Sequence, residues 1–84
     1  MQLRQGNLTW QVVGEDVVVL DLEGSVYLKV NGSGRVLWEA LTQPCTESAL
    51  VARLVDRYGI NEAHASTDVE TFLADLRSRD LLAE

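Results

Sequence analysis

The 84-residue chain is poor in the side chains that most often build reactive sites, with one cysteine, one histidine and one proline. A lone cysteine, Cys45, has no partner for a disulfide within the chain and cannot build a cysteine-based metal site by itself. His64 falls in a polar stretch that predicts a loop, where a solvated ring is far more common than a catalytic one. These shortages predict a protein that is not an enzyme and that holds neither a metal nor a cofactor.

Basic residues are also scarce, because 7 Lys and Arg stand against 13 Asp and Glu, for a formal net charge of −6. Proteins that bind nucleic acid take much of their affinity from Lys and Arg placed against phosphates. The charge balance therefore argues against a nucleic-acid partner. An acidic surface instead favours solubility or a partner that carries basic groups.

Long apolar runs are missing. No segment approaches the roughly 20 apolar residues that a membrane span needs, and the first ten residues lack the apolar stretch of a signal peptide. We therefore expect a cytoplasmic protein with no membrane partner. A chain of this length buries one modest core, so residues 1–84 are predicted to form a single domain.

The first thirty residues alternate apolar and polar side chains, which predicts strands. Three such runs cover residues 7–13, 16–22 and 25–30, and turn residues around Gly14 and Gly24 separate them. Short turns of this kind join antiparallel neighbours. The pattern predicts a three-stranded antiparallel meander.

After residue 32 the apolar spacing becomes helical. The first helix is predicted to be capped by Asn31 or Ser33 and to end before Pro44. The second is predicted to start at a Thr46 cap and to stop at Gly59. These signals are typical of short amphipathic helices.

A third helix is predicted over residues 66–80, because Thr67 and Glu70 have the spacing of a capping box. Residues 59–65 before it are interpreted as a loop. Three strands followed by three helices define an α+β domain. Within it, Trp10 and Trp38 are interpreted as core anchors in preference to contact residues.

The segment Gly32-Ser33-Gly34 precedes a helix, as phosphate-binding loops do. It lacks the lysine of a P-loop and the third glycine of a dinucleotide fingerprint. We interpret it as a strand-to-helix corner.

Two strand edges of the meander are predicted to lack a partner, and an open edge is a template for an added strand. An extended peptide can pair there through its main chain, while alternate side chains enter a neighbouring groove. Protection of that edge by Lys29 and by twist is an equally good interpretation. Composition alone favours neither outer strand.

Several short motifs follow one another in order along nearly the whole chain. They are Leu20-Asp21, Gly24, Tyr27, Asn31, Trp38, Thr46, Asp68-Val69, Phe72-Leu73 and Leu76. Their order and spacing resemble the PqqD-like family. Two departures lie in turns: Pro44-Cys45 stands where the family often has Asp-Gly, and Asp80 stands where a glycine commonly precedes the final Leu-Leu.

The resemblance implies a winged helix-turn-helix-like fold and the role of a RiPP recognition element, which binds the leader segment of a ribosomally made precursor peptide without catalysis. In that family the leader adds antiparallel to the third strand and lies between it and the third helix. Carried over by position, the resemblance implies a leader-binding site formed by Val26, Tyr27, Leu28, Lys29, Val30, Asp68, Val69, Phe72, Asp75 and Leu76.

The chain is most similar to the discrete recognition proteins of lasso-peptide pathways, whose partners are a leader peptidase and a cyclase. A PQQ-type peptide chaperone for a radical-SAM enzyme is the nearest alternative. A winged-helix nucleic-acid-binding domain is the rival class, but the third helix sets two arginines against four acids, a net of 2 − 4 = −2. A scaffold that only dimerises through its sheet edges is a further alternative.

Overall fold

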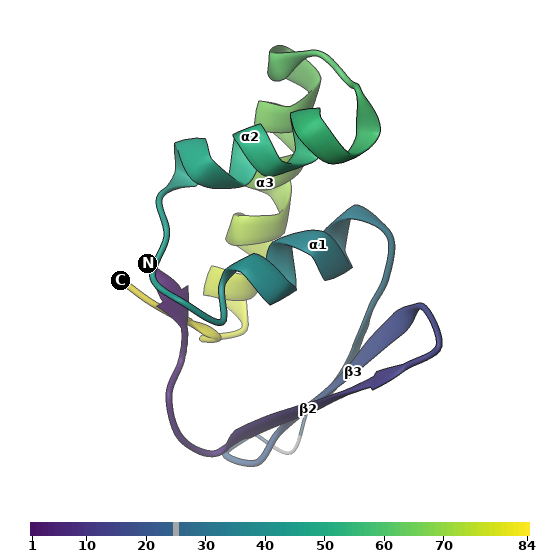
Figure 1. The fold of residues 1–84 in the computed structure, drawn as a ribbon. Coiled ribbons are helices and arrows are strands. Elements are labelled where there is room, and N and C mark those ends of the chain that lie inside the picture. Colours follow the sequence, from purple (N-terminus) through teal and green to yellow (C-terminus); the bar gives the residue numbers. More distant parts are fainter. Residues whose placement is uncertain (25) are drawn as a thin grey trace.

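Three antiparallel strands and three helices make up most of the molecule (Figure 1). The computed structural model describes residues 1–24 and 26–84. The strands are β2 (Leu8–Val13), β3 (Asp16–Asp21) and β4 (Val26–Val30), and the helices are α1 (Ser33–Ala40), α2 (Glu47–Tyr58) and α3 (Glu62–Ser78). This order confirms the α+β architecture. Ser25, the first residue of the predicted third strand, lies outside the described residues.

The strand order β2-β3-β4 and the pairing register explain the alternation in the sequence. Val19 pairs with Trp10 on one side and with Leu28 on the other, and these three side chains share one face because side chains alternate along a strand. Val17 and Val19 are fully buried on that face. The helices lie over it (Figure 1), so the alternation follows from burying one face of the sheet.

The core joins all three helices to the sheet. Its buried members include Leu37 and Trp38 of α1, Leu54 of α2 and Leu73 of α3. The ring of Trp38 meets the ring of Trp10 edge to face, with centroids 5.7 Å apart and planes at 81°. Trp38 is a core anchor, as predicted, whereas Trp10 remains 39% exposed.

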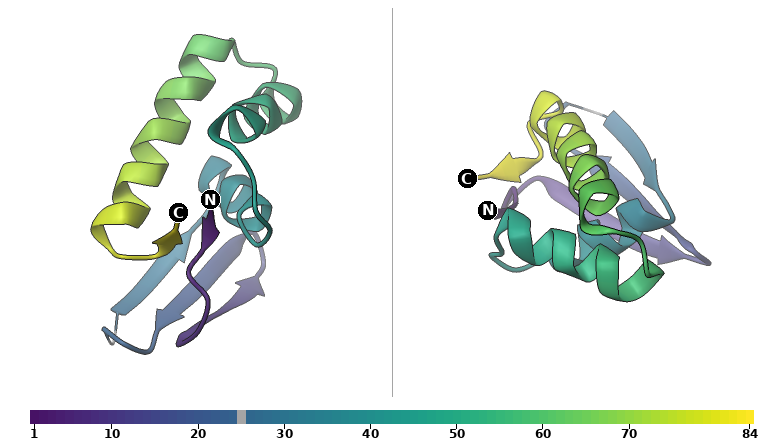
Figure 2. Two further views of the ribbon diagram at one scale, coloured as in Figure 1. Left: turned by 90° about the vertical axis from the view of Figure 1, so that its left-hand side faces the viewer. Right: turned by 90° about the horizontal axis from the view of Figure 1, so that it is seen from above.

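A second, two-stranded sheet joins the chain ends and was not predicted. It pairs β1 (Gln2–Leu3) with β5 (Leu82–Ala83), so the termini lie side by side in both views of Figure 2. The Leu3 amide also donates to the Leu41 carbonyl at 2.9 Å, and the Leu3 side chain is buried. Strands of two residues are too short to show alternation, so no periodic pattern predicts this sheet.

The third helix begins earlier than predicted. Asn61 is its N-cap and accepts a hydrogen bond from the His64 amide at 2.7 Å. The capping box at Thr67 was therefore wrong: Thr67 lies inside α3, and its hydroxyl donates to the Ala63 carbonyl at 3.1 Å. His64 sits in the first turn of α3, not in a loop. Ala65 is fully buried, and this burial stabilises the added turns.

Both termini of α2 follow the predicted chemistry, whereas the start of α1 does not. Thr46 caps α2 by accepting from the Ala49 amide at 3.2 Å, and Gly59 ends it in the left-handed conformation. The predicted cap of α1 by Asn31 or Ser33 was wrong, because the N-cap is Gly32 and no side chain bonds there. Gly32 has φ +57°, which glycine adopts without steric cost. In the described part of the chain, no helix is long and apolar enough to cross a membrane.

Candidate functional site

Strand β4 forms one edge of the three-stranded sheet. It pairs with β3 along its whole length: Val30 is opposite Val17 at one end, and Val26 is opposite Asp21 at the other. Within the described residues no strand pairs with its other side. The left view of Figure 2 shows it as the strand of the sheet on the side of α3. An exposed strand edge presents unpaired main-chain donors and acceptors, which suit the addition of an extended peptide.

The two faces of β4 differ in character. Leu28 and Val30 point toward the helices, where Leu28 is half-buried and Val30 is buried. Tyr27 and Lys29 point outward, and Tyr27 is 62% exposed. A peptide on this edge would place alternate side chains near the helices and the others beside Tyr27 and Lys29.

A hollow of about 480 Å³ lies along α3 beside the start of α1. The residues that line it are Ser33, Asp68, Thr71, Phe72 and Asp75. The four from α3 lie within two helical turns and recur at intervals of three to four residues, which places them on one side of the helix. This hollow, together with the β4 edge, is called the leader groove below, after the ligand that the family resemblance implies.

Beside the hollow, elements far apart in the sequence come into contact. A Cβ atom placed on Gly34 would lie 2.9 Å from Val30 Cγ1 and 3.3 Å from Phe72 Cε1. The backbone of α1 therefore touches both the end of β4 and the ring of Phe72. Phe72 is only partly buried, so its ring belongs to the core and to the groove wall at once.

The charged side chains at the groove have local polar partners. On α3, Asp68 lies 3.5 Å from His64 Nε2 and Asp75 lies 3.2 Å from Arg79 Nε. On β4, Lys29 Nζ lies 3.2 Å from the Asp16 carboxylate of the neighbouring strand. These pairs are largely solvent-exposed, so each contributes little to stability and leaves its groups free to exchange partners.

An arginine from outside the groove connects its two walls. Arg4 donates to the Asp21 carboxylate at 2.6 Å and to the Asp80 carbonyl, just after α3, at 3.0 Å. Asp21 also accepts from the Glu23 and Gly24 amides in the turn before β4. Hydrogen bonding from Arg4 lowers the pKa of Asp21, and the same contact raises the pKa of Arg4. The pair ties the turn before β4 to the end of α3.

The structure brings four of the predicted site residues together: Asp68, Phe72 and Asp75 line the hollow, and Val30 packs at Gly34 beside Phe72. Leu28 faces the helices from β4, and Tyr27 and Lys29 lie on the outer face of that strand. Val69 and Leu76 are fully buried and support the α3 wall from within the core. Val26 is placed in β4 by its pairing with Asp21.

Two lining residues were missed by sequence reasoning. Thr71 stands between Asp68 and Asp75 at helical spacing, a signal that was present in the sequence. Ser33 reaches the groove only because α1 starts directly after β4, which no local pattern reports.

The residues at this site suit binding better than chemistry. Apart from Asp68 and Asp75, the lining offers two hydroxyls and an aromatic ring. Throughout residues 1–24 and 26–84, no group of three or more His, Cys, Asp or Glu side chains is placed to hold a metal ion.

Comparisons with known proteins agree with this fold. The family model described as "Coenzyme PQQ synthesis protein D (PqqD)" matches residues 16–82. Among solved structures, the fold is similar to "TbiB1 in Complex with the TbiA(beta) Leader Peptide", with a TM-score of 0.88 and 20% identity over 100% of both chains. It is also similar to "Lasso peptide synthetase B1 complexed with the leader peptide", with a TM-score of 0.84 and 16% identity over 99% of this chain and 96% of that one. No curated protein matches.

Proposed function

Because the chain belongs to the PqqD family, we propose that it binds the leader segment of a ribosomally synthesised precursor peptide by adding that segment as a strand to β4. The observation that carries the proposal is an open strand edge beside the hollow whose wall is Phe72. Main-chain hydrogen bonds would supply affinity that does not depend on the leader sequence, and the groove would supply specificity.

The groove can sort the side chains of an added strand. Side chains on the helix side would meet Phe72 and the carboxylates of Asp68 and Asp75, while those on the outer side would lie beside Tyr27 and Lys29. A buried aromatic contact commonly dominates the affinity of such an interface, with charged groups at the rim setting orientation. We therefore assign the anchor contact to Phe72 and orientation to the rim charges.

Leader capture would make this single-domain protein a non-catalytic, cytoplasmic adaptor. By holding a precursor next to an enzyme, the adaptor turns the encounter of enzyme and substrate into an intramolecular event. Two proteins of similar fold were solved with leader peptides, and one of them is a lasso peptide synthetase B1, which favours the lasso-peptide branch of the family. In that branch the expected partners are a leader peptidase and a cyclase.

The family description favours a second candidate. A PQQ-type peptide chaperone would use the same groove but would deliver its peptide to a radical-SAM enzyme. The two candidates share the leader groove and differ in the enzyme that receives the peptide.

Titration of the ¹⁵N-labelled protein with a leader peptide tests the binding step. The probe is a leader peptide encoded by a short precursor-type open reading frame, to be sought beside the gene. Saturable amide shifts confined to residues 25–30 and 67–77 support strand addition. Shifts that are absent, or that appear only with duplex DNA, contradict it and favour the nucleic-acid rival. Self-association without peptide binding favours the dimerising scaffold.

A further inference from the structure

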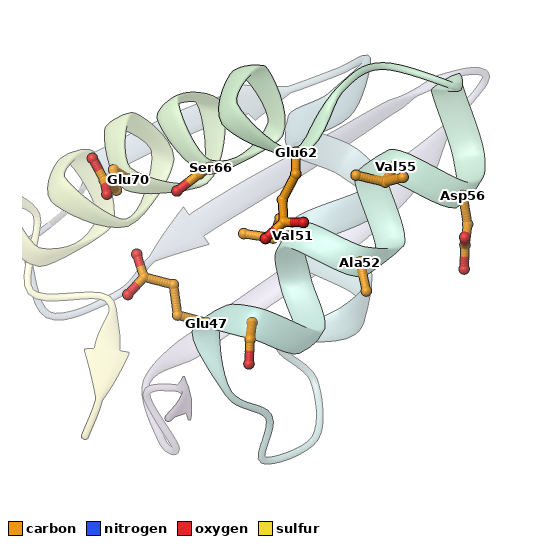
Figure 3. Close-up of a pocket in the computed structure, with 9 residues that line it drawn as sticks. Glu47, Val51, Ala52, Val55, Asp56, Glu62, Ser66 and Glu70 are labelled. Atoms are coloured by element: carbon orange, nitrogen blue, oxygen red, sulfur yellow. The ribbon is translucent and has the colours of Figure 1, made fainter.

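A second groove lies between α2 and α3, away from β4. It is a hollow of about 520 Å³, and its floor is formed by Val51 and Val55, which stand one turn apart on α2 and are only partly buried (Figure 3). Ser66 of α3 points toward the same space. This hollow is called the helical groove below.

Four carboxylates surround that apolar floor: Glu47, Asp56, Glu62 and Glu70. In Figure 3, Glu47 and Glu70 lie at one end of the helical groove, Glu62 lies over Val51, and Asp56 lies at the other end. The lining includes no lysine or arginine. Its charge therefore complements a cationic surface.

These carboxylates are not already neutralised. Among the described residues, the ion pairs within 4.0 Å involve other acids, namely Asp16, Asp21, Glu23, Glu39, Asp68, Asp75 and Glu84. Arg77 has an electrostatic interaction with Glu47, but its close partner is Glu84, at 2.7 Å. The helical groove thus presents charges that lack a close cationic partner beside apolar surface that is partly exposed.

The walls of the helical groove determine what shape of ligand fits. Both α2 and α3 satisfy their main-chain groups internally, so the groove offers no free edge for an extended strand. A helical ligand satisfies its own main chain and presents a stripe of apolar side chains. The 12 residues of α2 span about 18 Å, which matches a ligand helix of about three turns.

Resting on the proposed leader-binding function, we propose that the helical groove docks a cationic amphipathic helix of the enzyme that acts on the captured precursor. Apolar side chains of that helix would contact Val51 and Val55, and flanking lysines or arginines would meet the four carboxylates. Delivery requires one contact with the leader and another with the enzyme. The two grooves lie on different sides of α3, since Glu62, Ser66 and Glu70 line one and Asp68, Phe72 and Asp75 line the other.

A matched pair of double variants tests the proposal. Asp56→Lys/Glu70→Lys reverses two charges of the helical groove, whereas Glu15→Lys/Glu39→Lys reverses two exposed charges outside it. Both change the net charge by the same amount. The probe is a capped 14-residue peptide of Leu and Lys with leucines at helical spacing, and the control peptide has the same composition in strict alternation.

The proposal predicts saturable amide shifts at Val51, Val55 and Ser66 with the helical peptide and none with the alternating control peptide. It predicts at least a tenfold loss of affinity in the groove variant and less than a threefold loss in the charge-matched variant. Equal losses in both variants, or shifts spread over every acidic residue, would mean non-specific attraction and would overturn the proposal. Absence of saturable shifts would overturn it as well.

Leader affinity is measured separately on the same variants, so that the two proposals fail independently. Asp56→Lys/Glu70→Lys is expected to bind the leader with an affinity within twofold of that of the parent. The same variant is expected to slow processing of the precursor by the pathway enzyme at least tenfold. Normal processing with the groove variant overturns the docking proposal and leaves leader binding intact. If the unaltered protein does not bind the leader, the proposed function is overturned instead.

Discussion

Arg4 and Asp21 form an ion pair 2.6 Å long that connects the N-terminal segment to the turn before β4. Asp21 is the one buried charged side chain among residues 1–24 and 26–84. Through the Asp80 carbonyl, Arg4 also reaches the end of α3. The pair therefore holds β4 and α3, the two walls of the leader groove, in a fixed relation without lying in the groove.

Removing either partner is expected to weaken both folding and leader binding. Arg4→Met and Asp21→Asn each leave a partly buried polar group with fewer partners, which costs more than the pair itself contributes. We expect each variant to lower the thermal midpoint by about 5 °C, as measured by circular dichroism. We also expect about a threefold to tenfold loss of leader affinity, because small shifts of positioning elements change coupling by such amounts.

The double variant provides the control. Residues in direct contact are not additive, so Arg4→Met/Asp21→Asn should lose clearly less stability than the sum of the single losses. Additive losses would show that the two side chains act separately, which contradicts the role given to the Arg4–Asp21 pair.

The same pair predicts how stability responds to acid. The pKa of Asp21 is lowered in the folded state by its hydrogen bond from Arg4. The unfolded carboxyl, with a pKa of about 3.9, therefore takes up a proton first as the pH falls. The stabilisation by Asp21 is present in full above that value and disappears as the pH falls through the lower pKa of the folded state.

Urea unfolding measured from pH 6 to pH 2 tests this dependence. The parent should lose stability more steeply below pH 4 than Asp21→Asn, whose side chain does not titrate. Parallel curves for the two proteins would mean that Asp21 adds nothing to the acid response. Glu84→Gln is a useful comparison, because Arg77 lowers the pKa of the exposed Glu84 as well.

Asp80 adopts φ +58°, a left-handed conformation that glycine adopts more easily. Its position follows α3 and precedes the buried Leu81. Asp80→Gly removes the steric cost at Cβ, and we expect a gain of about 0.5–1 kcal/mol in the free energy of unfolding. The opposite change at Gly59, which has φ +65°, should destabilise: Gly59→Ala is expected to lose about 1 kcal/mol. Urea denaturation measures both, and a loss of stability in Asp80→Gly would contradict the account.

Phe72 is the predicted anchor of the leader groove. Phe72→Ala should weaken leader binding at least about tenfold, because it removes the aromatic wall that an inward-facing leader side chain would contact. Part of the ring belongs to the core, so the variant must be checked for folding by its amide spectrum.

Tyr58→Ala is the matched control, since it removes an exposed aromatic ring of α2 that does not line the leader groove. Isothermal titration calorimetry with the leader measures both variants. Equal affinity in Phe72→Ala and the parent would remove Phe72 from the site.

Local patterns in the sequence predicted the elements whose signals are periodic. The meander followed from the alternation around Val17 and Val19, and α2 followed from Thr46 and Gly59. The start of α3 was misplaced because Thr67 and Asn61 both carry cap chemistry, and burial of Ala65 favours the earlier cap. Two competing local signals are resolved only by tertiary packing.

The candidate site shows the same division. The family resemblance predicted Phe72, Asp68 and Asp75. Their helical spacing explains why they lie on one side of α3. Two contacts join residues far apart in the chain. One packs Gly34 against Val30 and Phe72, and the other is the ion pair of Arg4 with Asp21. No local pattern encodes such contacts, so sequence reasoning missed both.

Amide hydrogen exchange of β4 with and without the leader tests the central claim most directly. Strand addition gives the outward-facing amides of β4 new hydrogen-bond partners, while the amides already paired with β3 gain less. The account predicts that alternate amides within Val26–Val30 become protected on leader binding and that the edge amides of β2 do not. Leader binding that leaves every β4 amide unprotected, or that protects β2 instead, would contradict strand addition at this edge.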